Sequence, residues 1–263
     1  MSSHQLKAAP GGNLWGMVMA TAILIDGAFF LRRFKHSFPE LDRNDPKSVA
    51  HGLKLLANWH PVQRIGPTQV AAQVAQHSPI EVSRQFYRIF FYDCPPLEKR
   101  MHTPLEHKSI DFGKSPEAVF RRQFYIELQK LRKMALRLGH LNNTSRWRLR
   151  ESATERLIAN PTAFIPSDAD FEMDTKQKGV DMRLGLDVAS LAFKKQVDQI
   201  VIVAADADFV PAAKLARREG IDVILDKMGS TSVAGELIEH VDAIRDCQLI
   251  NSKVRVDGGF EPA

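Results

Sequence analysis

The sequence predicts an α/β protein organised around a mainly parallel sheet. The run Ile200–Val203 consists of β-branched residues without polar alternation, which is typical of a strand buried on both faces. Gln85–Tyr92 is a second strongly β-prone run, and Met17–Ile25 is a third. An amphipathic segment follows Ile200–Val203 at once, with Pro211 near its start, and predicts a strand-to-helix unit. At 263 residues, 44% of them hydrophobic, the chain is long enough for one large α/β domain with an insertion.

The first predicted strand, Met17–Ile25, ends at Asp26 and Gly27, where glycine is expected to let the backbone turn sharply. The apolar run that contains this strand is too short to span a bilayer and fits a signal peptide poorly. We therefore expect a cytoplasmic protein with no membrane partner. An Asp-Pro pair then signals the start of a helix over Lys47–Trp59, and a second helix is predicted over Thr68–Gln76.

The predicted domain spans residues 16–250, between a disordered tail at 1–15 and a mobile tail at 251–263. Its two cysteines, Cys94 and Cys247, give neither a disulfide framework nor the spacing of metal ligands. They are consistent with free thiols in a reducing compartment.

Residues 95–176 interrupt the alternation of strands and helices and are predicted to be a basic, partly helical insertion. The main helix of this insertion is predicted over Pro116–Leu138, where apolar residues recur at helical spacing. This helix could pack on its own domain or on a second copy, so a homo-oligomer stays open. Asp93, just before the insertion, is interpreted as a turn residue ahead of two prolines rather than as a site carboxylate.

The positive charge of the chain is concentrated in the insertion. Between Lys114 and Arg150 ten Lys or Arg residues face two Glu, a balance of +8, whereas the whole chain has a formal charge of +5. A solvated helix face is the simpler explanation, but a tryptophan within the cluster adds a stacking surface and favours contact with RNA. The predicted RNA-binding residues are Arg121, Arg122, Lys130, Arg132, Lys133, Arg146, Trp147 and Arg148.

Aspartates recur where the later predicted strands and helices meet. Asp206 and Asp208 follow the strand Ile200–Val203, at the sheet edge where ligands of open α/β sheets bind, although either could be a turn or N-cap residue. Asp181 starts a predicted helix. Asp187 borders the inward face of that helix, where a carboxylate is costly unless it is paired or bound to a metal.

Together these aspartates predict a metal site. Mg²⁺ and Mn²⁺ prefer oxygen ligands, and Mg²⁺ needs only a few carboxylates in addition to substrate phosphates. Beside a basic surface, such a site indicates metal-assisted hydrolysis of phosphodiester bonds. The predicted metal ligands are Asp26, Asp181, Asp187, Asp206 and Asp208.

The C-terminal quarter predicts a strand over Asp222–Leu225, a helix over Ser232–His240 and an edge strand over Cys247–Asn251.

Three segments resemble the signature blocks of the NYN domain family within the PIN-like nuclease superfamily, closest to its LabA-like bacterial subgroup. They read ILIDGAFF, KGVDMRLGLDVASLA and VIVAADADFVPAAKLARREGIDV and lie within residues 20–226. The resemblance implies a Rossmann-like three-layer sandwich with strand order near 3-2-1-4-5 and a metal-dependent ribonuclease, by expectation endonucleolytic. It implies catalytic roles for Asp26, Asp181 and Asp206.

The chain departs from the family pattern in two places. Ala28 stands where Asn is common two residues after the first aspartate, and the usual SGDSDF block reads AADADF. The missing asparagine supports one alternative, a weakly active or inactive RNA-binding or regulatory protein with the same fold. A different phosphoryl-transfer enzyme of the DxD type is a second alternative, although Asp26-Gly27-Ala28 does not give the usual nucleophile box of such enzymes.

Overall fold

The computed structural model describes residues 20–60, 62–65, 80–83, 85–141, 146–175, 177–250 and 253–257. These residues form a mixed α/β fold around a seven-stranded sheet of order β15-β14-β13-β12-β1-β4-β7. Six strands are parallel, and β15 pairs with β14 in the antiparallel direction. The strands are β1 (Ala20–Asp26), β4 (Gln85–Asp93), β7 (Met134–Leu138), β12 (Gln199–Val203), β13 (Asp222–Asp226), β14 (Ala243–Ile250) and β15 (Lys253–Asp257).

The order of the parallel strands confirms the Rossmann-like prediction. Numbered along the chain, the six strands are arranged 3-2-1-4-5-6, which extends the expected 3-2-1-4-5 by one strand. Successive strands are added on one side of β1 up to β7 and on its other side from β12 onward, so the order of strand addition reverses between β1 and β12. These two strands are parallel, and Ile25 pairs with Val203. This position is the topological switch point of the sheet, beside which open α/β sheets bind ligands.

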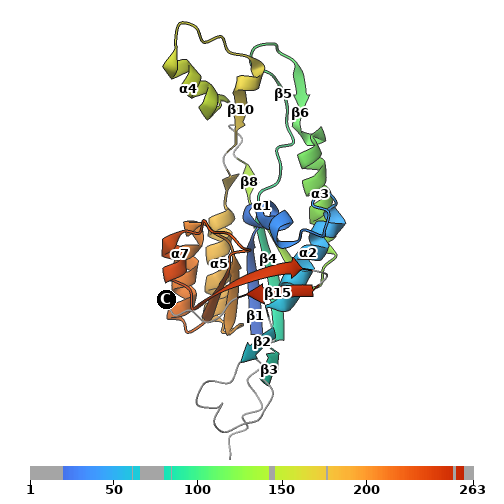
Figure 1. Ribbon diagram of the computed structural model, residues 1–263, viewed down its shortest axis with the longest axis vertical. Helices are drawn as coiled ribbons and strands as arrows, with labels where there is room; N and C mark the ends of the chain where they lie inside the picture. Colours follow the sequence, from blue (N-terminus) through green and yellow to red (C-terminus); the bar gives the residue numbers. More distant parts are fainter. Residues whose placement is uncertain are drawn as a thin grey trace, which may run out of the picture.

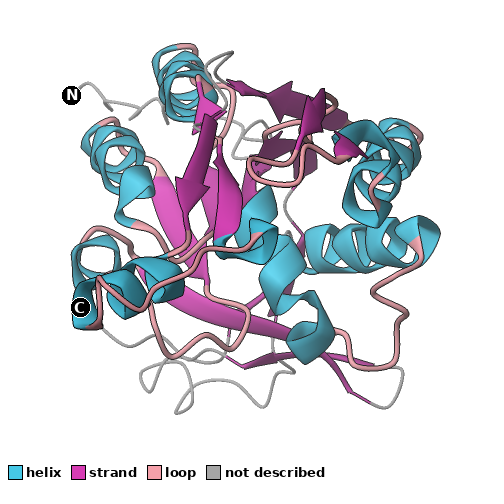
Figure 2. Ribbon diagram, turned by 90° about the horizontal axis from the view of Figure 1, so that it is seen from above, coloured by secondary structure: helices cyan, strands magenta, loops and turns pink. Residues whose placement is uncertain are grey.

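Helices cover both faces of the sheet and complete the three-layer sandwich (Figure 2). One core cluster packs the first three helices against β1, β4 and β12, and a second packs the later helices against the opposite face. The first layer contains α1 (Gly27–Ser37), α2 (Pro46–Trp59) and α3 (Pro116–Gln129). The second contains α5 (Val180–Phe193), α6 (Val210–Arg218) and α7 (Gly235–Glu239).

Local capping explains why two of these helices begin where they do. The Asp45 carboxylate accepts from the backbone N–H groups of Lys47 and Ser48, and proline occupies the first position of α2. The helix predicted over Lys47–Trp59 is therefore confirmed. At the start of α3, the Ser115 hydroxyl accepts from Ala118 N–H in the same way.

The single long helix predicted over Pro116–Leu138 is wrong in its second half. α3 ends at Gln129, Lys133 takes a positive φ of 64°, and β7 begins at Met134. The spacing misled because Met134, Leu136 and Leu138 also alternate with period two. In the structure these three residues pack on the face of the sheet that α1 to α3 cover, and β7 pairs with β4 as an edge strand.

The remainder of the insertion forms an arm that extends beyond the carboxyl edge of the sheet (Figure 1). We define the arm as residues 94–115 and 139–178, which leave the carboxyl ends of β4 and β7. Trp147 Nε1 donates to His102 O at 2.9 Å, and Asp168 accepts from the backbone of Leu105 and Glu106, so the two halves are tied together. The elements of the arm are β5 (Arg100–His102), β6 (Ser109–Asp111), η1 (Phe112–Lys114), β8 (His140–Leu141), β9 (Arg146–Leu149), α4 (Glu151–Ala159), η2 (Asp168–Asp170), β10 (Phe171–Asp174) and β11 (Gln177–Lys178).

The remaining predicted helices and strands have different outcomes. The predicted helix Ser232–His240 is the shorter α7. The strand predicted over Cys247–Asn251 begins earlier, as β14, and the prediction that it is an edge strand is wrong, because β15 pairs with its outer side. A hairpin of β2 (Val62–Ile65) and β3 (Ile80–Ser83) precedes β4. The predicted helix Thr68–Gln76, the start of the first predicted strand and the two tails lie outside the described residues, except for 253–257. Within the described part of the chain, no helix is both long and apolar enough to cross a membrane.

Candidate functional site

The carboxyl ends of β1 and β12 place aspartates on both sides of the topological switch point. Asp26 is the last residue of β1, and Asp206 follows β12 by three positions. Asp208 lies two residues further, in the 3₁₀ helix η3 (Ala207–Phe209). A ligand bound at this crevice therefore meets carboxylates from two neighbouring strands.

Asp26 is held in a fixed orientation by the helix that it caps. Its Oδ1 atom accepts from the backbone N–H groups of Ala28 and Phe29 at 2.9 and 3.1 Å. Burial raises the pKa of Asp26, and the carboxylate of Asp93 adds to this, while the two backbone bonds and the Arg32 guanidinium act in the opposite direction. The result is a half-buried carboxyl group that holds its proton more tightly than usual.

Gly27 is required at this point by close packing rather than by its backbone angles. A Cβ atom on Gly27 would lie 2.8 Å from the Phe91 ring and 2.8 Å from the Tyr92 carbonyl oxygen. The sharp turn expected from the sequence is present, because β1 ends at Asp26 and α1 begins at Gly27, and the glycine lets α1 start directly against β4.

A second group of aspartates is exposed on the other side of the switch point. The neighbouring Asp206 carboxylate raises the pKa of Asp208, partial burial contributes, and Asp181 adds to the effect. Asp181 lies in the first turn of α5, which begins after Gly179 takes a left-handed φ of 82°. Asp206 and Asp181 therefore both lie within electrostatic range of Asp208.

Asp187 has other partners, which argue against its predicted role as a metal ligand. Its two oxygens accept from Arg137 Nε at 2.7 Å and Nη2 at 3.1 Å, and the Tyr92 hydroxyl donates to Oδ2 at 3.0 Å. The hydrogen bond to Asp187 raises the pKa of Arg137. We interpret this side chain as one that fixes α5 to β4 and β7 beneath the site.

Asp93 is the residue that sequence reasoning undervalued. It is buried at the end of β4, and its Oδ2 accepts from Arg121 Nη1 at 2.5 Å and from the Tyr125 hydroxyl at 2.9 Å. Arg121 and Tyr125 lie four residues apart on α3, a spacing that could have indicated a shared buried partner. The predicted role of Arg121 in RNA binding is therefore corrected. Its side chain is only 18% exposed and pairs with Asp93 rather than facing solvent.

The predicted carboxylates do not form a tight preassembled cluster. Among the described residues, one group of at least three His, Cys, Asp or Glu side chains has its ligand atoms within 4.8 Å of one another, and it is His60, Asp226 and Cys247. The five aspartates predicted as metal ligands are not such a group.

The predicted RNA-binding residues fall at two opposite ends of the molecule. Because α3 runs back from the arm to the start of β7, Lys130, Arg132 and Lys133 lie at the amino edge of the sheet, away from the aspartates. Lys133 also donates to Phe86 O at the start of β4. These three residues are therefore misplaced for a role beside the predicted carboxylates.

The other basic residues belong to the arm or to the part of α3 next to it. Arg122 pairs with Glu98 at 2.8 Å, and Arg148 donates to Glu172 at 3.0 Å. Trp147 packs near Phe112 with ring centroids 6.1 Å apart. Arg146 is exposed and forms no ion pair within the described residues.

A pocket of about 560 Å³ opens beside the first layer of helices, and one of its lining residues, Arg32, acts electrostatically on Asp26. Arg32 and Arg43 contribute positive charge to its walls, Phe120 contributes an aromatic side chain, and the lining residue Arg121 is paired with Asp93 and faces Glu117, which also lines the pocket. Arg32 and Arg43 are exposed and have no ion pair with a described residue. The pocket thus combines cationic and aromatic groups, the pair of features that nucleotides engage.

Part of the chain is similar to a known protein family. Residues 117–247 match the NYN domain. The match includes Asp181, Asp206 and Asp208 but begins after Asp26, and it favours a PIN-like nuclease at a coarse level. The LabA-like subgroup stays a prediction.

Two further proteins are similar to the chain. An uncharacterised protein from Methanocaldococcus jannaschii is 32% identical over 107 residues, which span 41% of this chain and 42% of that relative. The crystal structure of a protein of unknown function from Vibrio parahaemolyticus superposes with a TM-score of 0.42 and 12% identity, covering 90% of this chain and 96% of the other.

Proposed function

We propose that the chain is a metal-dependent ribonuclease that hydrolyses RNA phosphodiester bonds endonucleolytically, with Mg²⁺ or Mn²⁺ as its cofactor. The observation that supports this most strongly is the position of Asp26 and Asp206 on the two sides of the topological switch point. The NYN match over residues 117–247 agrees with it. Catalytic roles are proposed for Asp26, Asp181 and Asp206.

The separated carboxylates fit a cation that binds together with its substrate. Mg²⁺ keeps several waters and takes one or two carboxylates plus substrate phosphates, so it needs no closed protein cage. Asp181, Asp206 and Asp208 are exposed, and their mutual repulsion favours a cation among them. When bound, the metal would lower the pKa of water and neutralise charge on the scissile phosphate.

Asp26 has a different task in this proposal. Its Oδ1 atom is committed to the backbone of α1, which fixes the direction of the carboxyl group. A carboxyl whose pKa is raised by burial accepts a proton from an attacking water more readily than an ordinary aspartate. Asp26 is therefore proposed as the proton acceptor.

The arm is the proposed surface for the remainder of the RNA. It extends from the same edge of the sheet as the aspartates, and it presents Arg146 and Arg148 on β9. Arg32 and Arg43, in the pocket beside the first layer of helices, would hold the phosphates nearest the cleaved bond. Lys130, Arg132 and Lys133 lie at the opposite edge and have no part in this path.

The decisive experiment is cleavage of a labelled circular RNA with Mn²⁺, with and without chelator. A circle has no ends, so any cut shows endonucleolytic action. Asp206→Asn and Asp26→Asn are expected to lower the rate by at least about 100-fold, because each removes a group used in the transition state. Glu219→Gln is the matched control, since this exposed residue lies at the end of α6 near the amino edge of the sheet.

The same experiment distinguishes the nuclease from the second candidate function, an RNA-binding or regulatory protein with the same fold. This alternative is favoured by the absence of three clustered carboxylates among the predicted ligands. Binding of the circle without any cut, over several RNA sequences and metals, would support it. Cleavage that persists in chelator or in both aspartate variants would reject the nuclease proposal as stated.

A further inference from the structure

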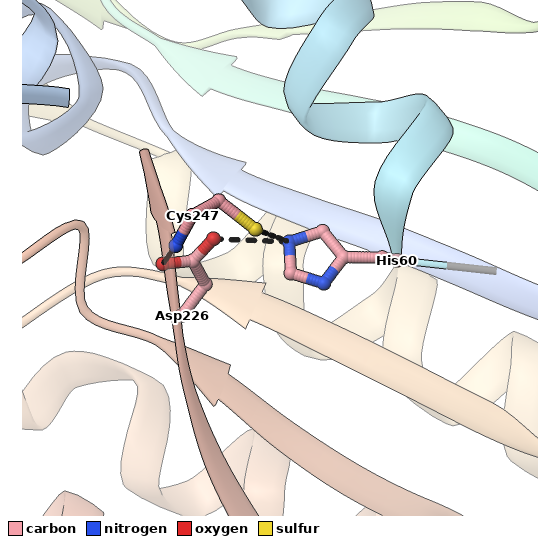
Figure 3. A group of neighbouring side chains, drawn as sticks. All are labelled: His60, Asp226 and Cys247. Atoms are coloured by element: carbon pink, nitrogen blue, oxygen red, sulfur yellow. Dashed lines mark hydrogen bonds and ion pairs between the residues drawn. The ribbon is translucent and has the colours of Figure 1, made fainter. Parts of the chain in front are cut away.

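Three buried side chains meet on the α2 side of the sheet, at the carboxyl end of β13, where Asp226 pairs with Val203 of β12. His60 follows the last turn of α2, Asp226 ends β13, and Cys247 lies in β14. The side chains of His60 and Asp226 are both 0% exposed, and Cys247 is equally buried. Figure 3 shows the imidazole ring facing the carboxylate and the thiol.

The contacts converge on a single ring nitrogen. His60 Nε2 lies 3.0 Å from Asp226 Oδ2 and 3.6 Å from Cys247 Sγ. The Cys247 thiol is also within hydrogen-bond reach of the Asp226 carboxylate, and the nitrogen, oxygen and sulfur atoms all lie within 4.8 Å of one another. A cation placed between the three atoms would satisfy all of them.

This arrangement differs from that of a nucleophilic cysteine. In a catalytic triad, the nucleophile and the acid contact different nitrogens of the histidine. Here both contact Nε2, and Nδ1 has no hydrogen-bond partner among the described residues.

We propose that His60, Asp226 and Cys247 bind a zinc ion. Ordinary zinc bonds to nitrogen, oxygen and sulfur in tetrahedral geometry impose separations of about 3.3 Å between N and O and about 3.5 Å between N and S. The observed 3.6 Å between Nε2 and Sγ is close to the second value, and the 3.0 Å between Nε2 and Oδ2 is shorter than the first by about 0.3 Å. Thiolate and imidazole ligands favour zinc over the hard cations Mg²⁺ and Ca²⁺.

The carboxylate is already oriented for this role. Asp226 Oδ1 accepts from Met228 N–H at 2.8 Å, which leaves Oδ2 directed at His60. Arg245 Nη1 donates to His60 O at 3.0 Å and holds the backbone that carries the ring. Such supporting bonds are typical of metal sites. A bound zinc would fasten the end of α2 to β13 and β14, which is a structural role separate from RNA cleavage.

The test uses the fact that the chain has only two cysteines. In a Cys94→Ser variant, Cys247 is the only thiol, so a thiolate-to-cobalt charge-transfer band after Co²⁺ loading must come from Cys247. The experiment loads the full-length chain with Co²⁺, records this band and then displaces the cobalt with Zn²⁺. We expect one Co²⁺ per chain, a tetrahedral spectrum and complete loss of the band on zinc addition.

Ligand variants supply the second measurement. His60→Gln and Cys247→Ser are expected to weaken zinc affinity more than about 100-fold, because even loss of a supporting bond costs roughly 10- to 100-fold. Cys94→Ser is expected to bind zinc as the unaltered chain does. Cobalt binding without the charge-transfer band would show that the ion sits on the aspartates instead, and absence of binding would show an ordinary buried hydrogen-bond cluster. Either result overturns the proposal. Both are measured on the Cys94→Ser chain, so they do not depend on whether a ligand variant folds.

Discussion

Replacing Asp187 by asparagine tests whether this residue holds the fold or holds a metal. The carboxylate accepts two hydrogen bonds from Arg137 and one from Tyr92, with side-chain exposures of 35% for Arg137 and 17% for Asp187. Hydrogen bonds to charged groups are worth about 1.5–3 kcal/mol each when buried, and partial exposure reduces that value. Asparagine keeps one acceptor. We therefore expect the free energy of unfolding to fall by about 2 kcal/mol.

The assay is urea unfolding followed by circular dichroism, beside a matched Asp174→Asn variant. Asp174 also faces an arginine, Arg148, but at 3.8 Å and with side-chain exposures of 60% and 36%, so its loss is expected to cost less than about 0.5 kcal/mol. The Mn²⁺ concentration for half-maximal RNA cleavage should be unchanged in Asp187→Asn. Unchanged stability together with a much higher Mn²⁺ requirement would refute our interpretation and restore Asp187 as a metal ligand.

Three further predictions address packing, RNA contact and thiol chemistry. Gly27→Ala should destabilise the fold by about 1–3 kcal/mol in the same unfolding assay, because its Cβ would overlap Phe91; a neutral effect would contradict the close packing. Arg146→Glu should weaken RNA binding and its salt dependence in a fluorescence titration, whereas Arg132→Glu at the opposite edge should not, and the reverse pattern would mean that RNA lies on the other side. Burial raises the pKa of Cys94 to about 11, so it holds its proton at pH 8 and should resist iodoacetamide until urea unfolds the chain; rapid alkylation of the folded protein would contradict this burial.

The fold was largely predictable because its strands have unambiguous patterns. The β-branched run Ile200–Val203 is fully buried in the centre of the sheet, as continuous apolar strands are in parallel sheets. The end of α3 was not predictable, since Met134, Leu136 and Leu138 fit both a helical stripe and an alternating strand. Only the pairing of β7 with β4 selects between the two.

Some residues of the candidate site were also predictable from the sequence, and others were not. Asp26 and Asp206 end strands, so their convergence follows from the strand order. Asp187 and Arg121 were misjudged because their partners, Arg137 and Asp93, come from other elements. A sequence gives the cost of burying a charge but not the identity of the residue that neutralises it.

The buried cluster shows this limit most clearly. His60 and Asp226 are 166 residues apart, and Cys247 is 187 residues from His60. Local spacing therefore carries no signal for this group, in contrast to metal motifs built within one hairpin or helix.

The central place of β1 in the sheet affects the order in which the chain can fold during synthesis. β1 pairs with β4 on one side, but its other edge waits for β12, and the paired residues Thr21 and Gln199 are 178 positions apart. At roughly 5–20 residues per second, that edge stays unpaired for about 10–35 s. An apolar strand with an open edge is a template for pairing with other chains. We therefore expect the open edge of β1 to be a point at which the ribosome-bound intermediate can aggregate.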